Sequence, residues 1–323
     1  MSIFLFVSSV QAAGTYKKLE LKEVVVAQWG HTYYLIYLPF YVALDKNFFI
    51  TQGLDVKIKF SGNDDQVFAT VISGKATFGI GDPVFTAIAR EKRGIKGKVV
   101  SLIVNKVSLW GVTNKNIPYI STYKDLNHLT IGTFPAPSTT YTIIKDIITQ
   151  YHLDAKIQEA PIGSQLALLE KGLADVVMLL EPAASIAEIE KGYRVVMSLP
   201  QLWGEFAFTG VTTTEDWIKK DPQTIQAFVN AIEMALNYIY THPEGAKEVA
   251  RKFLKDIKNQ DVIDKAVNRL IQDRVFPEHA AVSLQSWQKA LQVRVETGDL
   301  ASLKHMKDSI DNSFALKVQQ NLP

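Results

Sequence analysis

Two carboxylates occupy the same kind of position in this chain, and each could bind a ligand. Asp82 comes directly before Pro83 and Glu181 directly before Pro182, and each pair follows a short apolar run typical of a buried strand. Open α/β sheets bind small molecules at the ends of such strands. A carboxylate there forms charge-assisted hydrogen bonds with an amino-substituted heterocycle or an ammonium group. The alternative is that each carboxylate only caps the helix that begins behind its proline.

Three consecutive hydroxyl residues, Ser138, Thr139 and Thr140, stand at the head of an apolar-periodic segment that predicts a helix to about residue 151. Hydroxyls beside the unpaired N–H groups of a helix start suit an anion or a polarised carbonyl oxygen. The same groups also make an ordinary helix cap. Both roles remain open for this segment.

Aromatic residues gather near the same predicted strand ends, and some of them could sandwich a flat ring. Such stacking contributes about 0.5–1.5 kcal/mol per pair, although core packing takes most aromatic side chains. We expect two or three to reach a ligand, with Trp29 and Tyr34 first. Together with the two acids they favour a nitrogen-bearing ring over a sulfonate. Besides the two acids and the three hydroxyl residues, the candidate ligand-binding residues are the aromatics Trp29, Tyr33, Tyr34, Tyr37, Trp110 and Phe208 and the amides Gln28 and Asn63.

Alternating strand and helix patterns position these residues. A helix is predicted from Pro39 through Phe48, a second from Asn63 or Asp64 to Gly74, and a third after Asp82. This order predicts parallel strands with right-handed crossovers, and the chain is mostly helical from residue 215 onward. The predicted strands are 24–27, 54–60, 77–81, 98–104, 129–132 and 194–198.

Two segments, 66–83 and 164–182, resemble each other. Each reads as a helix that ends in Gly, then a strand, then an acid followed by Pro. The similarity indicates two related α/β lobes that direct acidic strand ends toward a shared cleft. The same pattern is also general in α/β proteins.

Composition narrows the class of protein. The 323 residues are 47% hydrophobic with a net charge of +2, and no basic stripe indicates a nucleic-acid partner. The absence of cysteine excludes thiolate metal sites, Cys nucleophiles and disulfides. His31 has no partner at metal or catalytic spacing, and no nucleophile-elbow, Walker or zinc-protease motif occurs. We therefore expect no enzyme, no metal and no cofactor. Residues 1–12 have the form of a signal peptide that is cut after Ala12.

Five blocks of the chain, in this order, resemble the SsuA/THI5-like (NMT1-like) family of type II periplasmic substrate-binding proteins of ABC importers. They are YLPFYVALDKNFFITQGLDV, SGNDDQVFATVISGKATFGIGDP, GTFPAPSTTYTIIKD, GLADVVMLLEPAAS and EDWIKKDPQTIQAFVNAI. The resemblance covers about residues 22–255. It implies an α/β fold of two lobes, each a mixed sheet flanked by helices. The implied lobes are 20–105 plus 212–323 and 106–211, joined by crossover strands near 104–112 and 205–211 and closing as a hinge.

The resemblance also implies a function. The expected protein is a monomeric periplasmic solute-binding protein that delivers a small polar organic ligand to an ABC permease in the inner membrane. A nitrogen heteroaromatic such as a pyrimidine thiamine precursor fits the acids and aromatics best. One alternative is a sulfonate or nitrate binder, because sulfonate binders of the family contact the anion with a Ser-Thr pair at the place of Ser138 and Thr139. A sensor role and a THI5-like pyrimidine synthase are the others; the synthase needs a cysteine-rich motif that this chain lacks.

Overall fold

Two five-stranded sheets organise the computed structural model, which describes residues 20–136 and 138–320. The first sheet has the order β2-β1-β3-β10-β4 and the second the order β7-β6-β8-β5-β9. The first comprises β1 (Lys22–Gln28), β2 (Leu54–Phe60), β3 (Phe78–Gly81), β4 (Gly97–Lys106) and β10 (Glu205–Thr214). The second comprises β5 (Trp110–Thr113), β6 (Thr130–Thr133), β7 (Lys156–Glu159), β8 (Val176–Leu179) and β9 (Arg194–Ser198).

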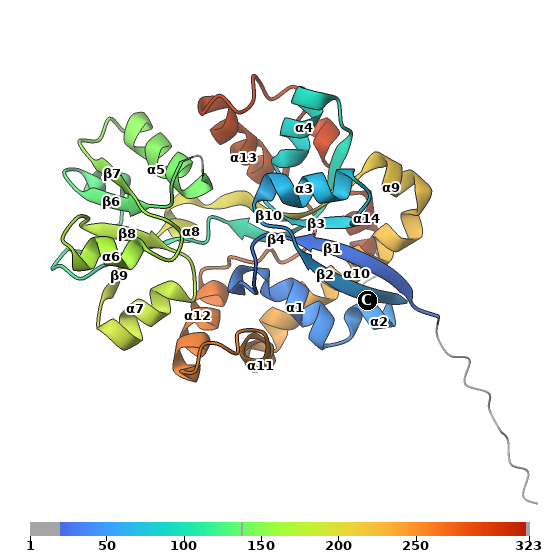
Figure 1. The fold of residues 1–323 in the computed structure, drawn as a ribbon, viewed down its shortest axis with the longest axis horizontal. Helices are drawn as coiled ribbons and strands as arrows, with labels where there is room; N and C mark the ends of the chain where they lie inside the picture. Colours follow the sequence, from blue (N-terminus) through green and yellow to red (C-terminus); the bar gives the residue numbers. More distant parts are fainter. Residues whose placement is uncertain (1–19, 137, 321–323) are drawn as a thin grey trace, which may run out of the picture.

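Both sheets are mixed. Strand β1 runs parallel to β2 and β3, whereas β10 is antiparallel to β3 and β4. Likewise β6 is parallel to β7 and β8, and β5 is antiparallel to β8 and β9. The predicted α/β class with a mixed sheet in each of two lobes is confirmed. Figure 1 shows the two sheets side by side, each with helices around it.

The two related sequence segments take equivalent places in the two sheets. Segment 66–83 supplies β3 and segment 164–182 supplies β8, and each of these strands is third in its sheet. Gly74 and Gly172 both have a left-handed backbone, with φ of 73° and 67°, where the preceding helix ends. Asp82 and Glu181 therefore follow corresponding central strands.

Fourteen α-helices are described, besides three short 3-10 helices. They are α1 (Leu38–Asp45), α2 (Phe48–Thr51), α3 (Asp64–Ile72), α4 (Phe85–Arg93), α5 (Thr139–Gln150), α6 (Gln165–Glu170), α7 (Ala183–Lys191), α8 (Leu199–Trp203), α9 (Glu215–Lys220), α10 (Pro222–Thr241), α11 (Pro243–Phe253), α12 (Gln260–Gln272), α13 (Leu284–Glu296) and α14 (Ser313–Gln320). The single helix predicted through Phe48 is wrong, because the chain breaks between α1 and α2. Asn47 has a φ of 59° there, a left-handed conformation that Asn tolerates better than most residues.

The C-terminal helices contact both groups of elements. Helix α12 packs against α7, and α13 packs against both β10 and α5. Figure 1 shows α13 between α4 and α5, and α12 beside α7. The predicted lobe boundaries stay a prediction. The predicted signal peptide, residues 1–12, lies outside the described residues. Among residues 20–136 and 138–320, no helix is both long and apolar enough to cross a membrane.

Candidate ligand-binding site

A cavity of about 630 Å³ lies where strand ends of the two sheets face each other. Its wall contains residues that follow β1, β2 and β3 of the first sheet and β6 and β8 of the second, together with part of β10 and α13. The volume falls in the range of small-molecule sites. Eight of the predicted ligand-binding residues line it: Trp29, Tyr37, Asn63, Asp82, Ser138, Thr139, Thr140 and Phe208.

Two further predicted aromatics pack beside the cavity wall instead of lining it. The ring of Tyr34 lies 4.7 Å from that of Trp29, tilted by 59°, so Tyr34 supports the indole from behind. Tyr33 makes edge-to-face contacts with Tyr41, Phe60 and Phe253. Such contacts belong to the core packing that takes most aromatic residues.

Gln28 and Trp110 are also placed in the interior. Gln28 is fully buried, and its side-chain oxygen accepts a hydrogen bond of 3.2 Å from the Tyr41 hydroxyl. The indole N–H of Trp110 donates to the Asp273 carboxylate at 2.7 Å. Both polar groups are thus satisfied within the protein, and neither residue lines the cavity.

Glu181 lies away from the cavity and acts as the cap of α7. Its carboxylate accepts hydrogen bonds from the backbone N–H of Ser185 at 3.1 Å and from the Ser185 hydroxyl at 3.0 Å. It also pairs with Arg269 of α12, and its side chain is 0% exposed. The capping alternative therefore describes Glu181, and a ligand in the cavity does not reach it.

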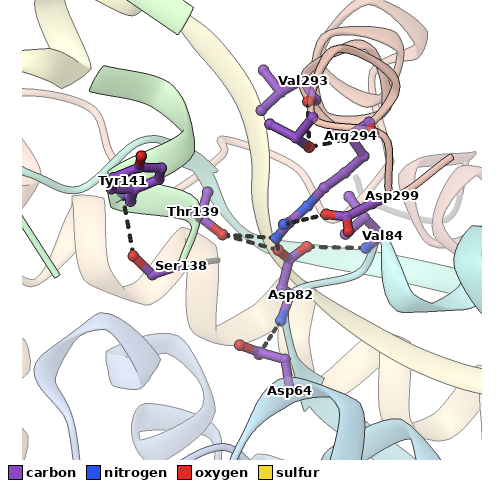
Figure 2. A network of polar contacts seen from close by, with 10 residues as sticks. Asp64, Asp82, Val84, Ser138, Thr139, Tyr141, Val293, Arg294 and Asp299 are labelled. Carbon is purple, nitrogen blue, oxygen red and sulfur yellow. Dashed lines mark hydrogen bonds and ion pairs between the residues drawn. The ribbon is translucent and has the colours of Figure 1, made fainter. Parts of the chain in front are cut away.

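Asp82 is in the cavity wall, but both of its carboxylate oxygens already accept hydrogen bonds (Figure 2). One accepts from the backbone N–H of Val84, the residue before α4, at 3.0 Å. The other accepts from the hydroxyl of Thr139 at 3.2 Å and from the guanidinium of Arg294 at 2.8 Å. Arg294 donates to Thr139 at 3.0 Å as well. Asp82 thereby joins the end of β3 to the start of α5 through α13.

Arg294 is the first residue of the site that the sequence patterns did not reveal. Its side chain is 6% exposed, and it also pairs with Asp299 at 3.1 Å. The guanidinium is thus shared between two carboxylates. No local pattern distinguishes Arg294 in the sequence, because its partner Asp82 lies 212 residues away.

Asp64 is the second residue of the site that the sequence patterns did not reveal. The backbone N–H of Asp82 donates to its carboxylate at 2.7 Å, which ties the start of α3 to the end of β3. Asn63 and Gln66 form a capping box at the start of α3, so Asp64 is not needed as the cap. Burial, reinforced by the nearby Asp82 carboxylate, raises the pKa of Asp64 to about 7.

The wall of the cavity carries more carboxylates than cations. The acids are Asp64, Asp65, Asp82 and Asp299, and the cations are Lys92 and Arg294. The rest of the wall is largely apolar and aromatic, with Trp29, Phe85, Phe134 and Phe208 among its members. A flat, weakly polar ring that carries hydrogen-bond donors matches this surface better than an anion does.

Asp64 makes stability depend on pH in a direction that follows from its pKa. The pKa is about 7 in the folded protein against an ordinary 3.8, so the folded state holds this proton more tightly. The resulting stabilisation is complete below about pH 4 and is lost as the pH rises through about 7. We therefore expect the melting temperature of Asp64→Asn to rise relative to that of the wild type as the pH increases from 5 to 8.

Differential scanning calorimetry of the two proteins across this range measures the effect. The pKa of Asp146 is also raised to about 7 by burial and by Glu296, but this carboxyl is present in both proteins and its contribution cancels. A difference in melting temperature that stays constant from pH 5 to pH 8 would contradict the raised pKa of Asp64.

Comparison with known proteins finds one matching family model and two relatives of low identity. A family model described as "NMT1/THI5 like" matches residues 36–246. A protein of Bacillus subtilis (strain 168) named "Putative binding protein YtlA" is 23% identical over 92% of this chain and 90% of its own length. The 4-amino-5-hydroxymethyl-2-methylpyrimidine phosphate synthase of Uromyces fabae is also 23% identical, over 79% of this chain and 76% of its own.

The fold has a close counterpart among solved structures. The periplasmic aliphatic sulphonate binding protein SsuA of Escherichia coli matches with a TM-score of 0.70. The match covers 90% of this chain and 97% of that one, at 14% sequence identity. The predicted two-lobed architecture of type II periplasmic binding proteins is confirmed by this similarity of fold.

Proposed function

The chain belongs to the NMT1/THI5-like family, and from this premise we propose that it is the solute-binding protein of an ABC importer. The family resemblance inferred from the five sequence blocks is confirmed by the match over residues 36–246. The proposed ligand is a nitrogen heteroaromatic of the size of a pyrimidine thiamine precursor. It binds in the cavity between the strand ends of the two sheets.

One observation carries the choice of ligand: the cavity combines an aromatic wall with an excess of carboxylates. Ser138, Thr139 and Thr140 still line the cavity and could contact an anion. However, the Thr139 hydroxyl donates to Asp82, and the Arg294 guanidinium beside it is paired with Asp82 and Asp299. A sulfonate entering here would meet four carboxylates, a guanidinium already shared by two of them, and Lys92 as the other cation of the described wall.

An enzymatic role finds less support. One curated relative is a pyrimidine phosphate synthase by name, but the cysteine-rich motif of THI5-like synthases cannot occur in a chain without cysteine. The relative YtlA is named as a binding protein. We therefore place this chain with the binding proteins of the family.

The remaining parts of the proposal follow from the same role. The two lobes, residues 20–105 plus 212–323 and 106–211, would close on the ligand about the crossover segments. The closed protein would dock as a monomer on an ABC permease in the inner membrane, and the protein would work in the periplasm after removal of residues 1–12. Presentation of the closed lobes to a membrane receptor, as in a sensor, would use the same surface.

A thermal-shift screen of the protein without residues 1–12 tests the proposed ligand class. The panel contains aminopyrimidines, thiamine precursors, riboflavin, taurine, alkanesulfonates, nitrate and bicarbonate. A compound that binds only the native state stabilises it by mass action and so raises the melting temperature. At a concentration of a hundred times its Kd, the compound raises the free energy of unfolding by about 2.7 kcal/mol. We expect the largest shift from a nitrogen heteroaromatic. A largest shift from a sulfonate or nitrate would favour the anion binder instead.

Trp29→Ala is expected to weaken binding of the best heteroaromatic from that panel about tenfold. The indole lines the cavity against Tyr34, and loss of one stacking partner removes about 0.5–1.5 kcal/mol in addition to buried area. Titration calorimetry measures the change. Trp217→Ala is the matched control, because Trp217 is also half-buried but lies outside this cavity. Equal affinities of Trp29→Ala and the wild type would remove Trp29 from the site.

A further inference from the structure

Asp64 differs from the other carboxylates of the cavity wall in having no cation partner while being half-buried. Both oxygens of Asp82 accept hydrogen bonds, and Asp299 pairs with Arg294. Asp65 is exposed to solvent. Within residues 20–136 and 138–320, Asp64 forms no ion pair and accepts one hydrogen bond, through a single oxygen, from the backbone of Asp82.

The fold holds this carboxylate in a fixed position. Its first oxygen is anchored 2.7 Å from the backbone nitrogen of Asp82. Gly81 makes that approach possible, since a Cβ at Gly81 would lie 2.6 Å from the same oxygen. Figure 2 shows the second oxygen directed away from Asp82, toward the side on which Ser138 lies. Asp64 thus presents one oriented acceptor to the cavity that it lines.

Among residues 20–136 and 138–320, no cation forms an ion pair with this acceptor, although the nearby Arg294 charge partly lowers the pKa of Asp64. Arg294, the nearby buried cation, is shared between Asp82 and Asp299. Lys92, the other cation of the wall, has an exposed side chain. A carboxylate that loses water when a ligand fills the cavity needs a hydrogen-bond donor or a positive charge in return.

We propose that Asp64 selects the ligand by accepting a hydrogen bond from a ring amino group or a protonated ring nitrogen. This inference rests on the proposed function, because it assigns the recognition of a heteroaromatic in the same cavity to one residue. The selected class is a flat ring that carries at least one N–H donor at its edge. Rings of the same shape without the donor bind weakly, and rings with a carboxylate in its place are rejected by like charge.

Three probes of one shape separate these cases: 4-aminopyrimidine, pyrimidine and pyrimidine-4-carboxylate. Each is titrated calorimetrically at about pH 8, above the raised pKa of Asp64, into the wild type, into Asp64→Asn and into Asp65→Asn. We expect the wild type to bind the amino compound about tenfold or more tightly than pyrimidine, and the carboxylate most weakly. Asp64→Asn should lose most of the preference for the amino compound, whereas Asp65→Asn, which changes an exposed acid in the next position, should keep it.

The outcomes distinguish this inference from the proposed function. Failure of all three probes to bind the wild type would overturn the heteroaromatic cavity, and the role of Asp64 with it. Binding of all three with equal affinity would leave the heteroaromatic cavity standing and overturn the role of Asp64. A melting curve of Asp64→Asn at pH 7 monitors folding. An equal loss of affinity for all three probes in that variant would also overturn the role, because it would mean that Asp64 only maintains the shape of the cavity.

Discussion

Arg294→Ala is expected to lower the free energy of unfolding by about 3–5 kcal/mol. Removing one member of a buried ion pair leaves its partners as uncompensated buried charges, which costs about this amount. Here two partners, Asp82 and Asp299, lose the same guanidinium, and the exposed fractions of the Arg294 and Asp82 side chains are only 6% and 10%. The substitution also removes the donor that Arg294 provides to Thr139 at the start of α5. We therefore expect weaker ligand binding as well.

Chemical denaturation of the wild type and of Arg294→Ala measures this loss. Lys191→Ala is the matched control, because Lys191 also loses an ion pair, with Glu170 at 2.6 Å, but on an exposed surface. Exposed ion pairs contribute little, so the control should unfold at the same denaturant concentration as the wild type. If the two variants lose equal stability, Arg294 does not have the structural role assigned to it here.

Asp273→Ala is expected to cost a similar amount, about 3–5 kcal/mol, at a different place in the fold. The Asp273 carboxylate is buried and accepts three hydrogen bonds, from Trp110 at 2.7 Å, Ser198 at 2.8 Å and Gln201 at 2.7 Å. These donors lie on β5, at the end of β9 and on α8, next to the two segments where the chain passes from one sheet to the other. Without the carboxylate, the indole N–H of Trp110 stays buried without an acceptor.

Asp125→Ala provides the control for this prediction. Asp125 also accepts three hydrogen bonds, from the backbone N–H groups of Ser121 and Thr122 and from the Ser121 hydroxyl, but it is exposed. Its loss should cost at most about 1 kcal/mol, as for a helix cap. Urea unfolding curves of both variants decide the point. A larger loss in Asp125→Ala than in Asp273→Ala would show that burial does not govern the strength of these networks.

The order of strands and helices could be predicted because it depends on local patterns. The alternation at residues 54–60 predicted β2 with the bounds observed, and the run 194–198 predicted β9 in the same way. The break at Asn47 was missed because the apolar spacing continues through α1 and α2, while a single left-handed residue interrupts the backbone. The spacing of hydrophobic residues does not predict a left-handed backbone conformation at a single position.

The candidate site was predictable only in part, for a physical reason. Strand ends and helix starts are readable in the sequence, so Trp29, Asp82 and Thr139 could be assigned to the cavity wall. Partners distant in sequence were not readable: Asp82 meets Arg294 across 212 residues and Trp110 meets Asp273 across 163. These pairings decide which polar groups of the site already have hydrogen-bond partners within the protein.

The choice of ligand rests on the same distinction. The two acids at corresponding strand ends, Asp82 and Glu181, suggested a nitrogen-bearing ring, but both are hydrogen-bonded within the protein. Asp64, one residue beyond the predicted Asn63, is the carboxylate that remains available to the cavity. Its burial depends on tertiary packing around the end of β3, which no local pattern in the chain encodes.

The most direct test of the proposed function is a side-by-side calorimetric titration of the protein without residues 1–12. The two titrants are 4-amino-5-hydroxymethyl-2-methylpyrimidine and ethanesulfonate, at the same pH and salt concentration. We expect saturable binding of the pyrimidine, with a Kd of about 1 μM or lower, corresponding to about −8 kcal/mol, and no measurable binding of the sulfonate. Saturable binding of ethanesulfonate without binding of the pyrimidine would contradict the proposed ligand class and identify Ser138–Thr140 as the centre of an anion site.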